Sequence, residues 1–290
     1  MEKELLDKCP SCDQDDFSLF VESNGEKIVK CNYCELLFVN PRPTESAIKK
    51  LFVEDYIETE ERVTEDFTNW RIDSLKREAD CIKLMLPSGG NLLDLGTASG
   101  FFLGLFADTS GWKVEGVEPS RYAAKAASEK YNVNVYAGFL GDQNLPSQSF
   151  DIVTSLDAFC FHPHPNKDIQ EIKRILKEDG LFALEIPGLS FRLLKNKGLF
   201  SRLIYGVPAR LNAGVHLIYY NRKTLGEMLE RHGFQEVKNL PERSPEYGPA
   251  IFRFLTRIYY NITSVLYRLT NGASWVPVPK EFLVYKKVEE

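Results

Sequence analysis

A glycine-rich turn follows a short apolar stretch about one third of the way along the chain. Leu92 and Leu93 precede Asp94, and the turn reads Gly96-Thr-Ala-Ser-Gly100. Glycine allows a sharp backbone turn and a close approach of a ligand to the main chain. Glu118 comes 22 residues after Gly96, at a predicted strand end, where a carboxylate can accept hydrogen bonds from ribose hydroxyls. Together the turn and the acid predict a nucleoside-binding site.

The turn differs from the two common phosphate-binding motifs. Ala98 and Phe101 occupy the second and third glycine positions of a G-x-G-x-x-G dinucleotide motif. No Gly-Lys-Ser/Thr follows, so no triphosphate-binding loop is indicated. A pyrophosphate needs an open helix N-terminus, and the bulky Phe101-Phe102 pair stands at that point. The turn therefore favours a nucleoside ligand without a pyrophosphate.

Two cysteine pairs near the N-terminus have the spacing of a metal site. Cys9-Pro-Ser-Cys12 and Cys31-Asn-Tyr-Cys34 are separated by 18 residues, which is typical of a zinc ribbon. Each pair offers two thiolates from one tight turn, and four thiolates close a tetrahedral structural zinc site with no open position for catalysis. The alternative is four unrelated buried cysteines. Asn24-Gly25 predicts a hairpin between the two pairs.

The elements that must position these residues alternate between strand and helix. This alternation predicts βαβ units and a mostly parallel sheet. After helical segments from Thr44 to Leu86, we expect strands at 91–95, 113–117, 133–136, 150–155, 181–186 and from 234, with helices at 101–107, 120–131, 167–177 and 224–231.

Composition narrows the class of protein. The 290 residues are 43% hydrophobic and 27% charged, with a formal net charge of −5, which indicates a globular chain and disfavours a nucleic-acid partner. The N-terminus lacks the pattern of a signal peptide, and no apolar run reaches the ~18 residues of a membrane span. We expect a cytoplasmic protein whose cysteines stay reduced.

The ordered set of motifs resembles class I S-adenosylmethionine-dependent methyltransferases. Residues 93–100 resemble the first motif of that family, and Glu118 falls where the family binds the ribose of its cofactor. Further similar stretches are 138–153, 172–181 and 216–234. The resemblance implies a doubly wound, seven-stranded Rossmann-like α/β sheet and a set of cofactor-binding residues: Asp94, Gly96, Ala98, Gly100, Glu118, Phe139 and Leu140.

The cysteine ribbon is similar to that of a subgroup of these enzymes that often act on sugars, glycans and small metabolites. We therefore expect methyl transfer to a small-molecule, sugar or glycan acceptor, with a structural Zn²⁺. The expected organisation is a ribbon at 1–43, a helical lead-in at 44–90, a methyltransferase domain at 91–240 with an insertion at 188–214 as a cap, and a helix-and-strand extension at 241–290.

Three histidines are candidates for the general base that an alcohol or an acidic carbon would need. His162 and His164 alternate with prolines in the loop after the predicted fourth strand, and His216 follows the insertion. That loop matches the family poorly, so no catalytic role is carried over from the resemblance. The alternative is a proline-stiffened loop with solvated histidines.

Two segments, the insertion at 188–214 and the segment 250–269, are both basic and apolar. The insertion mixes Arg and Lys with Phe and Leu, which suits an acceptor carrying phosphate or carboxylate, with a lipid or a sugar. The segment 250–269 has apolar residues at helical spacing and three arginines. It can dock on the insertion, pair with a second subunit or make peripheral contact with an anionic membrane. Docking is the default expectation, because amphipathic helices of globular proteins mostly pack on their own core, and the oligomeric state stays open.

Two other functions stay open. The first is an RNA methyltransferase whose ribbon would bind RNA. The ribbon is rich in acidic residues, however, which would repel the phosphates of RNA. A non-catalytic, cofactor-binding scaffold is the other alternative, because of the poor match in the histidine loop.

Overall fold

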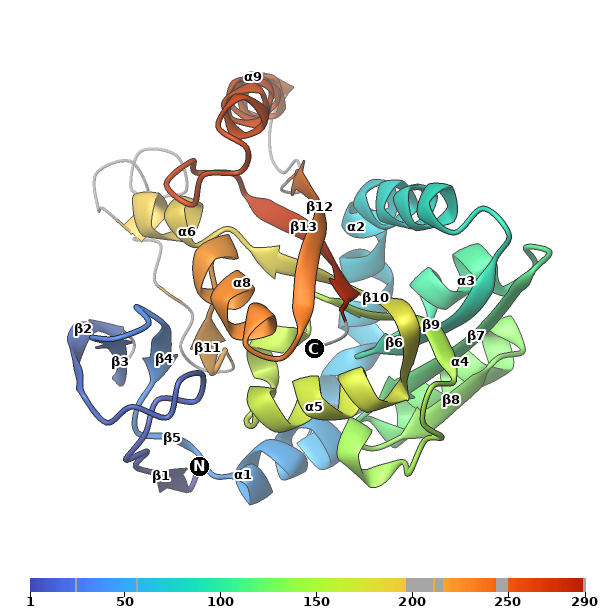
Figure 1. The fold of residues 1–290 in the computed structure, drawn as a ribbon, viewed down its shortest axis with the longest axis horizontal. Coiled ribbons are helices and arrows are strands. Elements are labelled where there is room, and N and C mark those ends of the chain that lie inside the picture. The colour runs from blue at the N-terminus through green and yellow to red at the C-terminus, as the bar shows by residue number, and fades with distance from the viewer. Residues whose placement is uncertain (24, 56, 197–210, 212–215, 244–249, 289–290) are drawn as a thin grey trace.

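The computed structural model describes residues 1–23, 25–55, 57–196, 211, 216–243 and 250–288. A central sheet lies between two groups of helices, and the small N-terminal ribbon lies at one side (Figure 1). The sheet consists of β6 (Gly90–Leu95), β7 (Trp112–Glu118), β8 (Asn134–Ala137), β9 (Phe150–Leu156), β10 (Leu176–Pro187), β12 (Phe234–Glu242) and β13 (Lys280–Lys287). The helices are α1 (Glu45–Lys50), α2 (Ile57–Met85), α3 (Phe101–Ala107), α4 (Arg121–Tyr131), α5 (Pro165–Ile175), α6 (Leu189–Asn196), α8 (Arg222–Glu230) and α9 (Ala250–Leu269).

The strand order confirms the expected doubly wound sheet. Its order is β12-β13-β10-β9-β6-β7-β8. The pairs β10–β9, β9–β6, β6–β7 and β7–β8 are parallel, whereas β13 is antiparallel to both of its neighbours. From β6 the following strands β7 and β8 are added toward one edge of the sheet, whereas β9 and β10 are added toward the other edge. The carboxyl ends of β6 and β9 therefore flank the crevice where such sheets bind ligands.

Alternating side chains of the strands build one core on each face of the sheet. Leu92 packs in the core beneath α2 and α3, and its neighbour Leu93 packs in the core beneath α5 and α8. Successive residues of a strand point to opposite faces, and a parallel sheet covered on both faces is apolar throughout. This explains the continuous apolar runs of the central strands.

Two boundaries differ from expectation. Helix α5 begins at Pro165 and ends at Ile175, and β10 begins at once with Leu176, which pairs with Phe150. The expected helix at 167–177 therefore runs two residues into a strand. Residues 280–287, expected in an extension beyond residue 240, form β13 between β10 and β12. The sheet thus depends on a strand that follows α9 in the chain.

The ribbon shares a sheet with the body of the protein. Strands β2 (Phe17–Ser23), β3 (Glu26–Cys31) and β4 (Leu37–Val39) are joined by β11 (Ile218–Tyr219), in the order β11-β4-β3-β2. A second small pairing joins β1 (Lys3–Glu4) and β5 (Arg42–Pro43). The Val39 amide also donates to the Leu217 carbonyl at 2.9 Å. The ribbon is thus fixed to the segment that contains His216.

The insertion and the tail helix are the outlying parts. Residues 189–196 of the insertion form α6, whereas most of the expected cap, 197–210 and 212–215, lies outside the described residues. Helix α9 projects beyond the edge of the sheet near β12 (Figure 1). Within the described ranges, none of the helices combines the length and the apolar character needed to cross a membrane.

Candidate active site

A cavity of about 970 Å³ opens at the carboxyl ends of β6, β7 and β9. Residues from the glycine turn, from the end of β7 and from the loop after β8 line one side of it. Residues of α1, α5 and the histidine loop line the other. The predicted site residues on its wall are Gly96, Ala98, Glu118, Phe139, Leu140, His162, His164 and His216.

The glycine turn has the backbone shape that its residue types require. Gly96 has a φ of +77°, and a Cβ built on it would lie 2.7 Å from the Cβ of Ala158. Any side chain at this position would therefore clash with the neighbouring loop. Ala98, at the middle position, also has a positive φ of 47°. The methyl of Ala98 does not prevent the turn that glycine would make there.

Glu118 closes the turn from the end of β7. Its carboxylate accepts hydrogen bonds from the Ala98 amide at 2.8 Å and the Ser120 amide at 3.0 Å. The side chain is buried, and this burial raises the pKa of Glu118 against the opposing effect of the two amides. The carboxylate stays within reach of the cavity, where a ligand hydroxyl can donate to its remaining lone pairs.

Two residues predicted to bind the cofactor, Asp94 and Gly100, are not among those that line the cavity. Asp94 is buried, and its carboxylate accepts from the Thr154 hydroxyl at 2.6 Å. Burial raises the pKa of Asp94 to about 7. Gly100 has a φ of +74° and packs against Ala127 of α4. Asp94 belongs to β6 and Gly100 precedes α3, and their contact with the cofactor stays a prediction.

His162 is the histidine best arranged to act as a base. It lies on the cavity wall, and its Nδ1 lies 2.8 Å from a carboxylate oxygen of Asp168 in the first turn of α5. A carboxylate can only accept, so Nδ1 carries the proton and Nε2 keeps the basic lone pair. The ring packs against Phe159, with 4.9 Å between the ring centroids. Both contacts fix the orientation of the ring.

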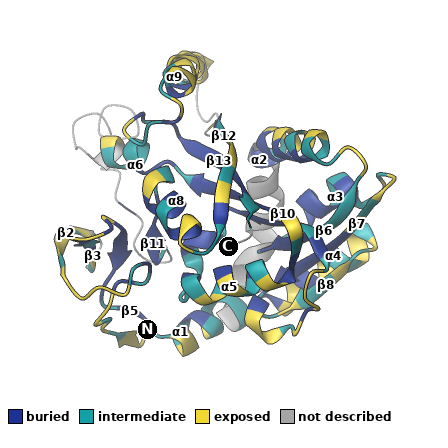
Figure 2. Cartoon of the chain, in the orientation of Figure 1, coloured by how far each residue is buried: buried dark blue, intermediate teal, exposed yellow. Residues whose placement is uncertain are grey.

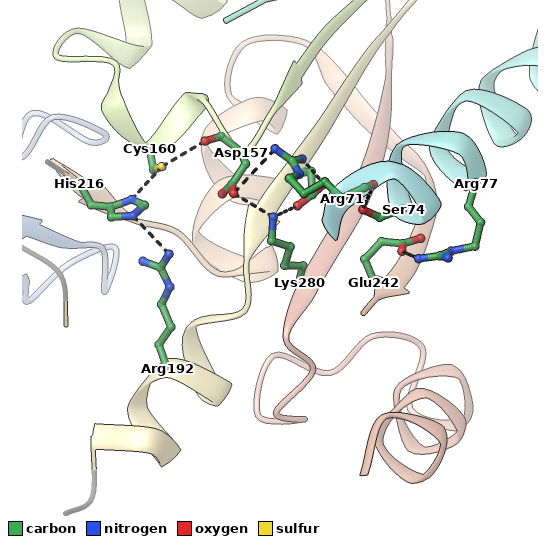
Figure 3. A network of polar contacts seen from close by, with 10 residues as sticks. Arg71, Ser74, Arg77, Asp157, Cys160, Arg192, His216, Glu242 and Lys280 are labelled. Carbon is green, nitrogen blue, oxygen red and sulfur yellow. Dashed lines mark hydrogen bonds and ion pairs between the residues drawn. The ribbon is translucent and has the colours of Figure 1, made fainter. Parts of the chain in front are cut away.

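The other two histidines are less suited to that role. His164 has its Nε2 3.2 Å from a carboxylate oxygen of Glu45 on α1 and is more exposed. His216 has both nitrogens engaged, with Nδ1 3.0 Å from the Cys160 sulfur and Nε2 3.3 Å from an Arg192 nitrogen (Figure 3). Burial lowers the pKa of His216 to about 4, so it is a weak base, and it stacks on Phe161 at 4.7 Å.

A charged cluster beneath the cavity was missed by the sequence analysis. Arg71 of α2 and Lys280 of β13 both pair with Asp157, which follows β9 (Figure 3). Both also pair with Glu185 of β10. The Arg71–Glu185 distance is 2.6 Å, and the Lys280–Asp157 distance is 2.8 Å. Arg71 and Asp157 line the cavity. The sequence signal that could have indicated this cluster is Asp157, an acid directly after the fourth strand, because the ends of the strands surround the ligand in such sheets.

The four predicted cysteine ligands come together. The sulfur atoms of Cys9, Cys12, Cys31 and Cys34 all lie within 4.8 Å of one another, and the Cys9–Cys34 and Cys12–Cys31 pairs are each 3.6 Å apart. Tetrahedral zinc with Zn–S bonds of about 2.3 Å spaces its sulfurs about 3.8 Å apart. The donor set and its spacing therefore fit a closed metal site.

The ribbon also supports the histidine loop. Buried Arg42 donates to the Pro163 carbonyl, and Asn166 donates to the Ser11 carbonyl, within the first cysteine turn, at 3.1 Å. The Leu217 amide donates to the Cys160 carbonyl at 3.0 Å. The loop that contains His162 is thus held on both sides by segments tied to the cysteine cluster.

The sheet order, the single antiparallel strand and the glycine turn closed by a strand-end acid define a class I S-adenosylmethionine-dependent methyltransferase fold. A profile described as methyltransferase domain matches residues 67–239. The chain belongs to this methyltransferase-domain family.

Individual relatives match only part of the chain. The C-methyltransferase NovU of Streptomyces niveus is 26% identical over 159 residues, which are 53% of this chain and 35% of NovU, so the chain spans about a third of that protein. The 1,6-didemethyltoxoflavin-N1-methyltransferase of Burkholderia thailandensis, solved with S-adenosylhomocysteine, gives a TM-score of 0.56 at 14% identity and covers 94% of this chain and all of its own. Geranyl diphosphate C-methyltransferase from Streptomyces coelicolor gives 0.52 at 12% identity, covering 73% and 77%. At these identities the two structures show a shared fold.

Proposed function

We propose that the protein transfers a methyl group from S-adenosylmethionine to a small-molecule acceptor whose nucleophile is deprotonated by His162. One observation carries the proposal: the glycine turn with Glu118 and the His162–Asp168 pair line the same cavity. Of the three relatives above, two are named C-methyltransferases, and the N1-methyltransferase was solved with bound 1,6-didemethyltoxoflavin and S-adenosylhomocysteine. The small molecules named with the two solved structures support a small acceptor.

The glycine-turn side of the cavity would hold the cofactor. Glu118 would accept hydrogen bonds from the ribose hydroxyls, and the Gly96 turn would let the nucleoside approach the main chain, which a Cβ would prevent. Phe139 and Leu140 would contact the adenine from the loop after β8. When bound, the sulfonium supplies an electrophilic methyl group for an in-line displacement. The residues around it position the two reactants.

The opposite side of the cavity suits a ring-shaped acceptor. Phe52 and Phe161 line it at a centroid distance of 5.9 Å, and His216 extends the aromatic wall. His162 Nε2 would take the proton from an acceptor hydroxyl or acidic carbon, while Asp168 stabilises the charged imidazole. Glu45, Asp142 and Glu171 also line the cavity. Lys49, Lys167 and Arg174 line it as well, so the wall carries both signs of charge.

The transfer itself provides the test. Purified protein would be incubated with S-adenosylmethionine labelled with tritium in the methyl group and with a panel of sugars, nucleotide sugars, phenols and heteroaromatic compounds. We expect label in at least one member of the panel and none in RNA. Label found only in RNA would contradict the proposal, and cofactor binding with no transfer to any acceptor would favour the scaffold alternative.

We also propose that the cysteine cluster binds structural Zn²⁺. Replacing Cys31 with serine removes one of the four sulfur ligands, so the zinc content should fall from about one ion per chain to near none. The melting temperature should fall as well, while S-adenosylmethionine affinity is retained because the glycine turn lies outside the ribbon.

The control is Cys81→Ser, a cysteine of α2 outside the cluster. It should keep the metal. Equal zinc content in the Cys31→Ser and Cys81→Ser proteins, measured by elemental analysis, would refute the assignment of the cluster.

A further inference from the structure

Helix α9 exposes a long apolar face. Ile262 is 63% exposed, Val265 58% and Leu269 79%. The other exposed apolar side chains of this helix are Ile251, Phe254, Leu255 and Ile258. At 100° per residue all seven fall on one side of the helix. Such a continuous exposed apolar face marks an interaction surface.

The opposite face fixes the helix to the protein, so the apolar face cannot simply turn inward. The Tyr260 hydroxyl donates to the Pro241 carbonyl at 3.0 Å, and the Tyr267 hydroxyl donates to Glu281 at 2.9 Å. Tyr267 is buried with Val276 and Val278. In Figure 2 the helix lies at the margin of the molecule, with exposed residues on its outer side. The tyrosine side of α9 packs on the protein, and Tyr259 contacts Phe191 of the insertion with 5.7 Å between the ring centroids, whereas the apolar side faces outward.

All formal charges on this helix are positive. Arg253, Arg257 and Arg268 are exposed, and at 100° per residue they lie together along one border of the apolar face. No acidic residue occurs between Glu246 and Glu281, although the whole chain carries a net charge of −5. Trp275, in the segment after the helix, is 61% exposed. An apolar face bordered by arginines and followed by an exposed tryptophan is typical of helices that lie in a membrane interface.

We propose that α9 binds the surface of an anionic lipid membrane, with its apolar face inserted among the lipids and its arginines at the headgroups. The charge pattern favours this occupant over a second copy of the chain, because a second α9 would bring positive charge toward positive charge, whereas anionic headgroups supply the opposite sign. This membrane-binding proposal does not depend on which molecule accepts the methyl group.

Co-sedimentation with vesicles tests the proposal. The full chain would be mixed with vesicles of phosphatidylcholine alone or with 30% phosphatidylglycerol, at low and at high salt. We expect binding to the anionic vesicles that weakens with salt and is much lower on neutral vesicles. The double change Ile258→Asp and Ile262→Asp should lower the partition coefficient about tenfold or more. Arg253→Glu should weaken binding to anionic vesicles only.

The control is Leu19→Asp, which changes an exposed leucine (60%) on β2 of the ribbon. Figure 1 shows β2 well away from α9. It should bind vesicles like the unchanged protein. Retained S-adenosylmethionine binding shows that each variant is folded. Absence of vesicle binding, or equal binding to neutral and anionic vesicles, would overturn the proposal. A dimer that the Ile258/Ile262 change converts to monomers in light scattering would instead assign the face to a second copy.

Discussion

Replacing His162 with asparagine should lower kcat for the acceptor by roughly 10²- to 10⁴-fold, the range that a positioned general base contributes. Asparagine keeps a polar side chain but has no basic nitrogen. The Kd for S-adenosylmethionine should stay unchanged, because Gly96 and Glu118 lie on the other side of the cavity. The measurement is steady-state kinetics with an acceptor from the labelling panel, together with titration of the cofactor.

His232→Asn is the control for this prediction. His232 follows α8, bonds the Met228 carbonyl at 2.9 Å and does not line the cavity. Its replacement should leave kcat within about twofold. A His162→Asn protein as active as the control would show that His162 does not act as a base. The protein would then act only by positioning the acceptor and the cofactor.

The second large effect concerns stability and the charged cluster under the cavity. Arg71 and Lys280 supply two positive charges, and Asp157 and Glu185 supply two negative ones. Burial opposes the ionisation of Glu185, but Arg71 and Lys280 outweigh it and lower its pKa. Glu78 is wholly buried nearby, and none of the described N–H or O–H groups reaches its carboxyl oxygens. Burial and the charge of Glu185 raise the pKa of Glu78, which favours the protonated form of Glu78 beside the two paired carboxylates.

Changing Glu185 to glutamine should therefore lower the free energy of unfolding by about 3–5 kcal/mol, because it leaves a buried positive charge without its partner. The shape of the side chain is kept, so the loss reports the charge and not a cavity. Urea unfolding followed by fluorescence measures the difference.

Glu129→Gln provides the comparison, since Glu129 forms an exposed ion pair with Lys125 at 3.8 Å on α4. Exposed pairs contribute about 0–1 kcal/mol, so this variant should unfold nearly as the original does. If the two variants lose equal stability, the buried cluster does not stabilise the protein as an ion-paired unit.

Local sequence patterns were sufficient to predict six of the seven strands of the central sheet and several residues of the cavity wall. The apolar runs alternate with amphipathic helices, and Gly96 and Glu118 are each close in sequence to the strand that positions them. The charged cluster was not predictable in this way, because Arg71, Asp157, Glu185 and Lys280 come from four elements spread over two hundred residues. No spacing rule links such positions; only the strand order brings them together.

The place of β13 and the orientation of α9 were missed for related reasons. A strand at the end of the chain can be added to an edge or inserted between two others, and its own residues do not distinguish these outcomes. An amphipathic pattern shows that a helix has an apolar face but not what covers it. In α9 the hydroxyls of Tyr260 and Tyr267 decide the docking, and these polar groups were not part of the apolar pattern.

Calorimetric titration of zinc-replete protein with S-adenosylmethionine tests the central claim most directly, with NAD as the comparison ligand. We predict micromolar binding of S-adenosylmethionine and none of NAD. Glu118→Gln should weaken binding by about 1–3 kcal/mol through the loss of a charged acceptor, whereas Glu115→Gln, on the same strand but outside the cavity, should not. Binding of NAD alone, or equal affinity in the Glu118→Gln protein, would contradict the assignment of this cavity as the cofactor site.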